Sequence, residues 1–213
     1  MIVMSHLPAS LRQLIAAVRG WVIFTVICGL AYPLVVFGIG QAAFHNGANG
    51  STVSFHGRVV GSTLLCQEFV DSKGNPLPQY FQPRPSAATS GASNDFGCNP
   101  LFSAASNLGP NNSKLVGLIK ARQKVIATLD HVPVSAIPPD AVTASGSGLD
   151  PDISPAYAAI QVNTVAAARH ISPAAVRALV AKYTDGRQLG ILGEPAVNVL
   201  LLNIALDKQF PVP

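Results

Sequence analysis

Side chains able to do chemistry gather in the stretch ASGSGLDPDISPAY, which occupies residues 144–157. Glycine, serine and aspartate at this density occur in phosphate-binding loops, around serine nucleophiles and in polar linkers. A phosphate-binding P-loop needs a Gly-Lys pair, and the chain has none. The dinucleotide fingerprint fails because Pro151 stands where its last glycine belongs, and the nucleophile elbow around Ser147 fails because Ser145 replaces its first glycine. We therefore predict no catalytic residue in the chain.

Metal-ligand patterns are also missing from the sequence. The histidines are isolated from one another, and neither Cys-x-x-Cys nor His-x-x-x-His occurs. Asp150 and Asp152 lie in a proline-flanked turn, where carboxylates commonly end loops and favour helix N-termini. We predict no metal site. Residues 145–154 are interpreted either as a shaped loop that leads into a helix or as a surface that binds a partner.

The composition indicates a membrane segment rather than a nucleic-acid-binding protein. Hydrophobic residues make up 49% of the 213 residues and charged residues only 11%, against about 25% in ordinary soluble domains. Residues 155–183 are predicted to form two short helices, as in a helix-turn-helix DNA reader. The second of these helices carries only Arg177 and Lys182, and the net charge of +4 is not clustered. We predict no nucleic-acid partner.

One apolar run near the N-terminus is long enough to cross a bilayer. Between Gly20 and Asn46 there is no Asp, Glu, Lys or Arg, and twenty such residues as a helix span about 30 Å. A cleaved signal peptide is the alternative, although its apolar region is usually only about 7–15 residues long. Arg12 and Arg19 precede the run and no basic residue follows it before Arg58, so the positive-inside rule keeps the N-terminus in the cytoplasm.

These features predict a single-pass protein in three parts. Residues 1–19 form a short basic cytoplasmic N-terminus, residues 20–43 a transmembrane helix, and residues 44–213 one exported domain. Cys66 and Cys98 both lie in the exported part, where a disulfide would persist, although two buried free thiols remain an equal alternative.

The exported part is predicted to be a mixed α/β domain. Residues 52–65 favour one or two short strands, and residues 71–112 are rich in Pro, Gly, Ser and Asn and favour irregular structure. A helix is expected to follow with Ser113 as its N-cap, and further helices to begin at the Ser-Pro pairs 154–155 and 172–173. Residues 187–195 are interpreted as a strand, and residues 194–207 as a helix or a buried strand.

Five stretches, in this order, closely resemble one family, the C subunit of the bacterial Kdp potassium-transporting P-type ATPase. They are YFQPRPSA at residues 80–87, SNLGPNN at 106–112, TASGSGLDPDISPA at 143–156, AAARHIS at 166–172 and LGEPAVNVLLLNIALD at 192–207. The resemblance covers nearly the whole chain. Asp152 stands where the family usually has histidine and Pro83 where Gly or Ser is commoner, and the two cysteines are not part of the pattern.

The resemblance implies a non-catalytic accessory subunit of an ATP-driven, high-affinity potassium import complex in the bacterial cell (inner) membrane. Such a subunit supports assembly of the complex, raises the ATP affinity of the ATP-hydrolysing subunit, or does both. Its partners would be an ATP-hydrolysing P-type subunit and a channel-like potassium-binding subunit, with K⁺ as the transported ion. The family is labelled ATP-binding, yet an exported domain would not meet cytoplasmic ATP, so we expect no bound cofactor. The competing interpretation is a solitary membrane-anchored envelope domain with a binding or hydrolase role.

Polar residues within the resembling stretches, or close to them, are the candidates for contacts with those partners. The alternative for each charged one is an ion pair or helix cap inside the domain; Arg169 and Arg187, for example, would pair with Asp150 or Glu194. The full set of expected partner-contact residues is Arg84, Asn107, Ser147, Asp150, Arg169, Arg187, Glu194 and Asn198.

Overall fold

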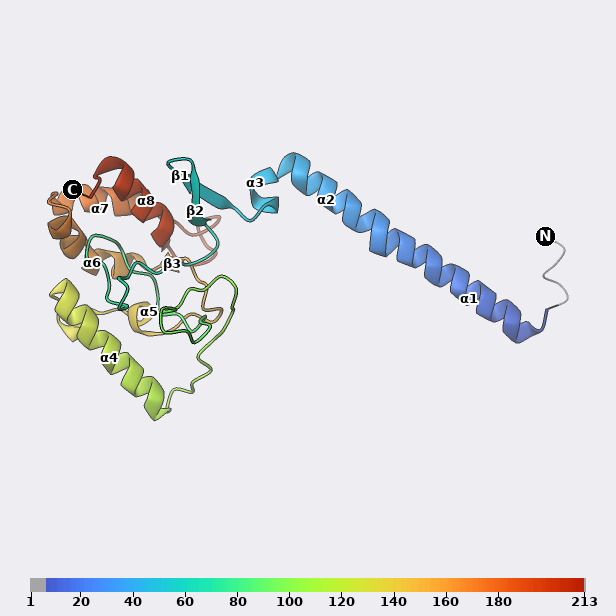
Figure 1. Cartoon of the computed structure of the whole chain (residues 1–213), viewed down its shortest axis with the longest axis horizontal. Helices are drawn as coiled ribbons and strands as arrows, with labels where there is room; N and C mark the ends of the chain where they lie inside the picture. Colours follow the sequence, from blue (N-terminus) through green and yellow to red (C-terminus); the bar gives the residue numbers. More distant parts are fainter. Residues whose placement is uncertain (1–6, 213) are drawn as a thin grey trace. The chain divides into compact units, whose positions relative to one another are not determined.

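The computed structural model describes residues 7–212 and divides the chain into two compact units that meet after Ser51. The first unit is a long helix with a short helical turn after it, and the second is a folded domain of helices and small sheets (Figure 1). The predicted mixed α/β class with one apolar N-terminal helix is confirmed.

The apolar helix is longer than the predicted span. It runs continuously through α1 (Ala9–Val26), a π-helical segment (Ile27–Ala31) and α2 (Tyr32–Ala43), and α3 (His45–Ala48) follows it. Within residues 7–212 it is the one helix long and apolar enough to cross a membrane. The π-helical segment ends two residues before Pro33. Proline lacks the N–H that a regular helix would use, and its ring crowds the carbonyl four residues earlier, which lies in this segment.

The domain is built from short strands and five helices within the described chain. The strands are β1 (Thr52–Phe55), β2 (Arg58–Ser62), β3 (Asp152–Ile153), β4 (Thr184–Asp185) and β5 (Ala196–Asn198). The helices are α4 (Ser113–Asp130), α5 (Pro139–Val142), α6 (Pro155–Ala168), α7 (Pro173–Lys182) and α8 (Val199–Gln209).

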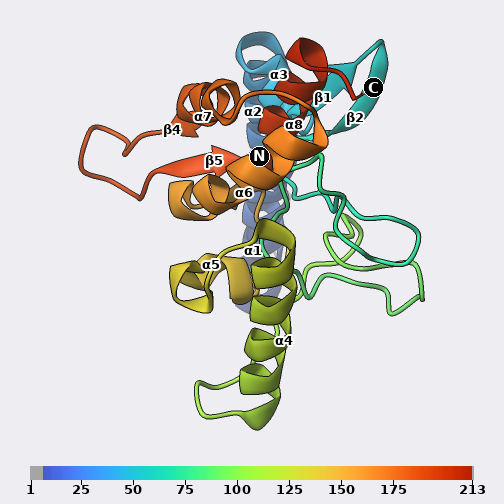
Figure 2. The same cartoon turned by 90° about the vertical axis from the view of Figure 1, so that its left-hand side faces the viewer.

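Both sheets are antiparallel and small. The β1 and β2 strands form a hairpin, and β5 lies between β3 and β4 in a three-stranded sheet. Figure 2 shows the irregular connection between β2 and α4 on one side of the domain and the β4–β5 connection projecting on the other. No helix or strand forms within residues 71–112, as the composition predicts.

Helix starts follow the predicted capping chemistry in two of three places. The hydroxyls of Ser154 and Ser172 accept hydrogen bonds from backbone N–H groups three residues on, and a proline follows each at the first helical position. The prediction for α4 is wrong by one residue. Asn112, which has an extended backbone, caps the helix by accepting from the Lys114 N–H at 2.9 Å, so Ser113 already lies in the first turn.

The predicted strand at residues 187–195 is also wrong. This segment is the turn between β4 and β5, and left-handed glycines at 190 and 193 prevent a continuous strand. The predicted helix at 194–207 divides into strand β5 and helix α8. Asn198 ends the strand and caps the helix through a bond from the Leu201 N–H to its Oδ1 at 3.1 Å.

The hydrophobic core lies between α6, α7, α8 and the three-stranded sheet. Its fully buried aliphatic side chains include Val162, Val176, Val197 and Leu202. Phe81, from the irregular stretch, is also fully buried in this core. The irregular stretch is therefore part of the folded interior and not a surface linker.

A disulfide joins Cys66 to Cys98 across 32 residues of sequence. Of the two alternatives open from the sequence, the structure selects the bonded pair. The crosslink closes a loop that contains much of the irregular stretch, where strand ladders do not hold the backbone.

Reducing this disulfide should destabilise the protein by about 2–4 kcal/mol, because closing a loop of this length restricts the unfolded chain. Urea unfolding of the purified protein in detergent, with and without reductant, measures the difference. The double variant Cys66→Ala/Cys98→Ala should be as unstable as the reduced protein and insensitive to reductant. Equal stability of the oxidised and reduced protein would contradict the expectation.

Candidate functional site

The loop at residues 145–152 is bound to the irregular stretch by its own backbone. Its carbonyl and N–H groups pair with three separate segments, which start near residues 66, 85 and 104. The bonds are Ser145 N–H to Pro85 O (3.2 Å), Ala104 N–H to Ser147 O (2.9 Å), Cys66 N–H to Leu149 O (3.1 Å) and Ser86 Oγ to Gly148 O (2.6 Å). Three carbonyl oxygens and one N–H of the loop are therefore occupied within the domain, which favours the shaped-loop interpretation.

Glycine is required at position 148 by both conformation and space. Its φ is +73°, and a Cβ there would lie 2.5 Å from the carbonyl oxygen of Ala104 and 2.8 Å from the Cβ of Ala88. Gly146, two residues earlier, has open space around it and an ordinary φ. The close approach of three backbone segments at Gly148 is what gives the loop its shape.

Arg84 and Asp150, both expected partner contacts, pair with each other. The Arg84 Nη1 donates to Asp150 Oδ2 at 2.7 Å, and about a quarter of each side chain stays exposed. The other carboxylate oxygen of Asp150 accepts the Asp152 N–H at 3.1 Å. The Nε of Arg84 is buried and has no hydrogen-bond partner within residues 7–212. The pair fixes the loop while leaving one charged edge at the surface.

Asn198 is a structural residue at the junction of the hairpin, β3 and α8. Its amide donates to Thr63 O at 2.9 Å and to Asp152 Oδ1 at 3.1 Å, in addition to capping α8. Burial raises the pKa of Asp152, and the bond from Asn198 opposes that rise. Asp152 is therefore used inside the domain as a hydrogen-bond acceptor.

Arg169 is enclosed, with none of its side chain exposed. It donates to Gln79 O, Phe210 O and Asp207 Oδ1, each at 2.7 Å, and lies over the Tyr80 ring. Arg169 therefore forms an ion pair inside the domain, which is the alternative to a partner contact. Its acidic partner is Asp207 and not Asp150 or Glu194. A partner has no free face of this guanidinium to contact.

Arg187 and Glu194 form the ion pair that the sequence offers as an alternative. The Arg187 Nη2 donates to both carboxylate oxygens of Glu194 at 2.9 and 2.8 Å, and both side chains are exposed. Asn107 and Ser147 are exposed as well, and Asn107 has a left-handed φ of +51°. The structure therefore gathers Arg84, Ser147 and Asp150 in one loop region and places the Arg187–Glu194 pair on the β4–β5 connection.

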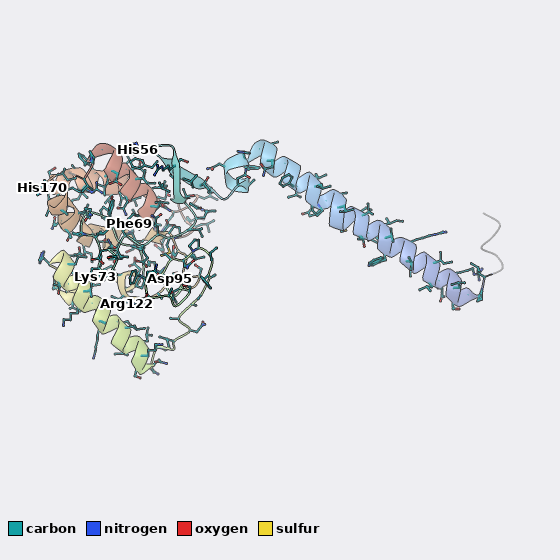
Figure 3. The ribbon with its side chains drawn as sticks, viewed as in Figure 1. His56, Phe69, Lys73, Asp95, Arg122 and His170 are labelled. Carbon is teal, nitrogen blue, oxygen red and sulfur yellow. A yellow bond between two sulfur atoms is a disulfide. The ribbon has the colours of Figure 1, made fainter. Side chains whose placement is uncertain are left out.

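A cavity of about 450 Å³ between α4 and the irregular stretch holds groups that the sequence patterns missed. Arg122 of α4 lines it and donates to Val142 O at 2.8 Å, while burial lowers its pKa (Figure 3). Tyr157 lines it from α6, and burial raises the pKa of its phenol. From the sequence, Arg122 could be placed only on the apolar face of a helix, through the hydrocarbon part of its side chain. Its hydrogen bond could not be predicted, because the acceptor, the Val142 carbonyl, lies twenty residues further along the chain.

Glu68 lines this cavity, and its pKa departs strongly from the ordinary value. Burial, reinforced by the nearby Asp95 carboxylate, raises its pKa to about 7. Asp95 itself keeps a depressed pKa because the backbone and hydroxyl of Ser90 and the amide of Asn99 donate to it. Nothing in the local sequence around Glu68 signals this environment. Within the part of the chain that the structure describes, no three His, Cys, Asp or Glu side chains are grouped as metal ligands.

Replacing Gly148 with alanine should destabilise the domain by several kcal/mol, because the added methyl meets backbone at 2.5 Å in a left-handed conformation. The matched control is Gly146→Ala, where the methyl enters open space and the effect should stay within about 0.5 kcal/mol. Thermal unfolding of both variants in detergent measures the contrast. Equal melting temperatures would show that the close approach at Gly148 is not rigid.

The raised pKa of Glu68 predicts a pH-dependent stability. The unfolded chain releases this proton near the ordinary value of 4.5 while the folded protein holds it to about 7, so folding should become less favourable as pH rises between these values. The free energy of unfolding of the Glu68→Gln variant should exceed that of the wild type by up to about 3 kcal/mol at pH 8. Below pH 4 the two free energies should be equal. Urea unfolding across this pH range measures the difference, with Glu194→Gln as the exposed control. A constant difference at all pH values would exclude the proposed titration.

Comparisons with known proteins cover both units of the chain. The family model described as "KdpC: K+-transporting ATPase, c chain" matches residues 14–208. A curated protein of Sorangium cellulosum named potassium-transporting ATPase KdpC subunit is 50% identical over 190 residues, which are 87% of this chain and 92% of that protein. Proteins of the same name from Paraburkholderia phytofirmans and Geobacter sulfurreducens are 48% and 45% identical, covering 88% and 94% of this chain and 92% and 100% of theirs. The chain belongs to the KdpC family, the c chain of K⁺-transporting ATPase.

Proposed function

We propose that this chain is a non-catalytic accessory subunit of an ATP-driven potassium-import complex and is held in the membrane by α1 and α2. The observation that carries the proposal is the family match over residues 14–208, which includes the apolar helix as well as the domain. A match to the domain alone would support a shared fold. A match that extends through the helix supports a shared place in a membrane complex.

The absence of a catalytic role is part of the proposal and is supported by how the polar residues are used. The carbonyls of Ser147, Gly148 and Leu149 are bonded to neighbouring segments, and Ser147 Oγ accepts the Leu149 N–H inside the loop at 3.0 Å. Arg169 and Asn198 are occupied by internal hydrogen bonds. These contacts are those of a scaffold, so chemistry and ion passage belong to partner subunits in this proposal.

The orientation is proposed from charge and supported by the disulfide. Arg12 and Arg19 precede the apolar run, and the first basic residue after it is Arg58. A disulfide between Cys66 and Cys98 fits an oxidising compartment outside the cytoplasm. With the domain outside, cytoplasmic ATP is out of its reach. Any rise in the ATP affinity of the hydrolysing subunit would then be transmitted through the span or through the partners.

The partners in this proposal are an ATP-hydrolysing P-type subunit and a channel-like potassium-binding subunit. Contacts to them would use the polar groups that the domain leaves at its surface. These are the edge of the Arg84–Asp150 pair, Asn107, Ser147 and the Arg187–Glu194 pair. Docking at the entrance of the channel-like subunit would hold the complex together or shape ion entry.

Purification of the tagged full-length chain from its own membranes in mild detergent should recover both partners, identified by mass spectrometry. The reason is that a subunit buries surface against its complex and so remains attached under gentle extraction. The same membranes with untagged protein provide the background control. Recovery of the chain alone, while other membrane complexes stay intact, would leave only the fold and revive the solitary envelope domain.

The orientation of the domain across the membrane can be tested separately by its accessibility to protease. Protease is added to cells whose outer membrane has been opened while the inner membrane stays intact. It should remove the domain and leave the membrane helix protected. Survival of the domain until the cells are lysed would place it in the cytoplasm and overturn the proposed topology.

A further inference from the structure

Arg122 brings a positive charge to the cavity between α4 and the irregular stretch, and the described chain gives it no counter-charge (Figure 3). Its Nη1 donates to the Val142 carbonyl at 2.8 Å. Within residues 7–212 its other N–H groups have no hydrogen-bond partner, and it forms no ion pair. The side chain is half-buried, and charges that leave water are usually paired, because they lose hydration. Arg122 is therefore a cation whose missing partner belongs in the cavity.

A second donor without a partner lines the same cavity from α6. Tyr157 is only 4% exposed, and its N–H and carbonyl are bonded to Ser154 and Gln161. Its hydroxyl forms no hydrogen bond within the part of the chain that the structure describes. A buried tyrosine hydroxyl usually has a hydrogen-bond partner. The cavity therefore offers a guanidinium and a phenol, and no described acceptor binds the hydroxyl or the free N–H groups of the arginine.

The two carboxyl groups of the lining do not neutralise Arg122. Neither Glu68 nor Asp130 forms an ion pair within the described residues. Burial raises the pKa of Glu68 to about 7 and the pKa of Asp130 to about 6, so burial favours the neutral acid in both. A neutral carboxyl group can donate its O–H to an oxygen atom of a ligand. The negative charge of the lining is therefore partly suppressed at mildly acidic and neutral pH.

The cavity also has an apolar wall that solvent reaches. Phe96 of the irregular stretch is 38% exposed and Val125 of α4 is 50% exposed, and both line the cavity. A Cβ at Gly74 would lie 2.6 Å from the Phe96 ring, so the ring packs directly on the glycine backbone. A ligand that covers this wall removes apolar surface from water. The volume of about 450 Å³ lies within the range of small-molecule sites.

From these observations we propose that the cavity binds a small organic monocarboxylate, whose carboxylate pairs with Arg122. The Tyr157 hydroxyl donates to the same carboxylate, and the aliphatic or aromatic body of the ligand lies against Phe96 and Val125. One unpaired guanidinium requires one negative charge, and its planar fork of N–H groups matches the two oxygens of a carboxylate. This site lies within the domain, so the inference does not depend on the proposed function.

A ligand series tests the charge and the apolar body separately. Titration calorimetry of the full-length protein in non-ionic detergent, with empty micelles as background, uses phenylacetate and hexanoate. At least one should bind saturably with a Kd of about 1 mM or lower. The neutral amides of the same acids should bind at least about tenfold more weakly, because they bring no charge to Arg122.

Three results of the ligand series would overturn the inference. The first is that neither carboxylate saturates the protein at about 10 mM. The second is equal binding of the amides, which would leave only an apolar cleft. The third is tighter binding of phenethylamine than of phenylacetate, which would assign the cavity to cations held by Glu68 and Asp130.

Arg122→Met is the variant that locates the site, because methionine keeps an apolar side chain and removes the charge. Its affinity for the bound carboxylate should fall at least about tenfold, while its affinity for the amide stays the same. The matched control is Lys124→Met, which removes one charge from an exposed position of α4 outside the cavity lining. This control should bind the carboxylate as the wild type does.

Tyr157→Phe keeps the test decisive if Arg122→Met does not fold, as its melting temperature would show. The phenylalanine removes only the hydroxyl, and the affinity for the carboxylate should fall by about threefold to tenfold. Unchanged affinity in a folded Arg122→Met or in Tyr157→Phe would place the ligand elsewhere and overturn the inference. An equal loss in Lys124→Met would show a general effect of net charge and overturn it as well.

Discussion

The domain depends on hydrogen bonds to the backbone of an extended segment that has no neighbouring strand in the interior. Residues 79–82 pass beside the core, and Phe81 is fully buried. The amide of Asn203 both accepts the Phe81 N–H and donates to its carbonyl, at 2.9 Å each. Gln161 accepts the Gln82 N–H at 2.7 Å. Two buried side-chain amides thus replace a neighbouring strand, because unpaired buried backbone groups would cost about 1–3 kcal/mol each.

The backbone of the loop at residues 145–152 is also hydrogen-bonded to segments that are not strands. Its backbone pairs with segments near residues 66, 85 and 104, and the disulfide ties the first of these to Cys98, which lies between the other two in the sequence. A stretch that resembles a catalytic loop in composition therefore acts as a replacement for a sheet edge. The glycine and serine content serves close backbone approach, and the chemistry of a nucleophile or a phosphate site is not needed to explain it.

This internal use of polar residues changes where partners are to be sought. Arg169, Asn198 and Asp152 form hydrogen bonds inside the domain. Arg84 and Asp150 form an ion pair with each other and remain partly exposed. The surface of the β4–β5 connection carries the exposed Arg187–Glu194 pair and three exposed aliphatic side chains. This internal use is consistent with an accessory subunit, whose polar side chains mainly stabilise its own fold.

Local features of this protein were determined by the sequence itself. The apolar run, the Ser-Pro helix starts at 154 and 172, the β1–β2 strands and the irregular stretch all depend on residues within a few positions of one another. The family resemblance likewise rests on contiguous motifs. These features follow from backbone conformation, capping and hydropathy, which neighbouring residues fix without knowledge of the fold.

Only the tertiary structure decided the contacts between distant segments. The pairing of Cys66 with Cys98, the choice of Asp207 as partner of Arg169, and the crowding around Gly148 join residues dozens of positions apart. The raised pKa of Glu68 and the division of residues 194–207 into a strand and a helix arise in the same way. Burial and partner choice are properties of the packed chain, since each depends on which segments meet in space and not on which residues are adjacent along it.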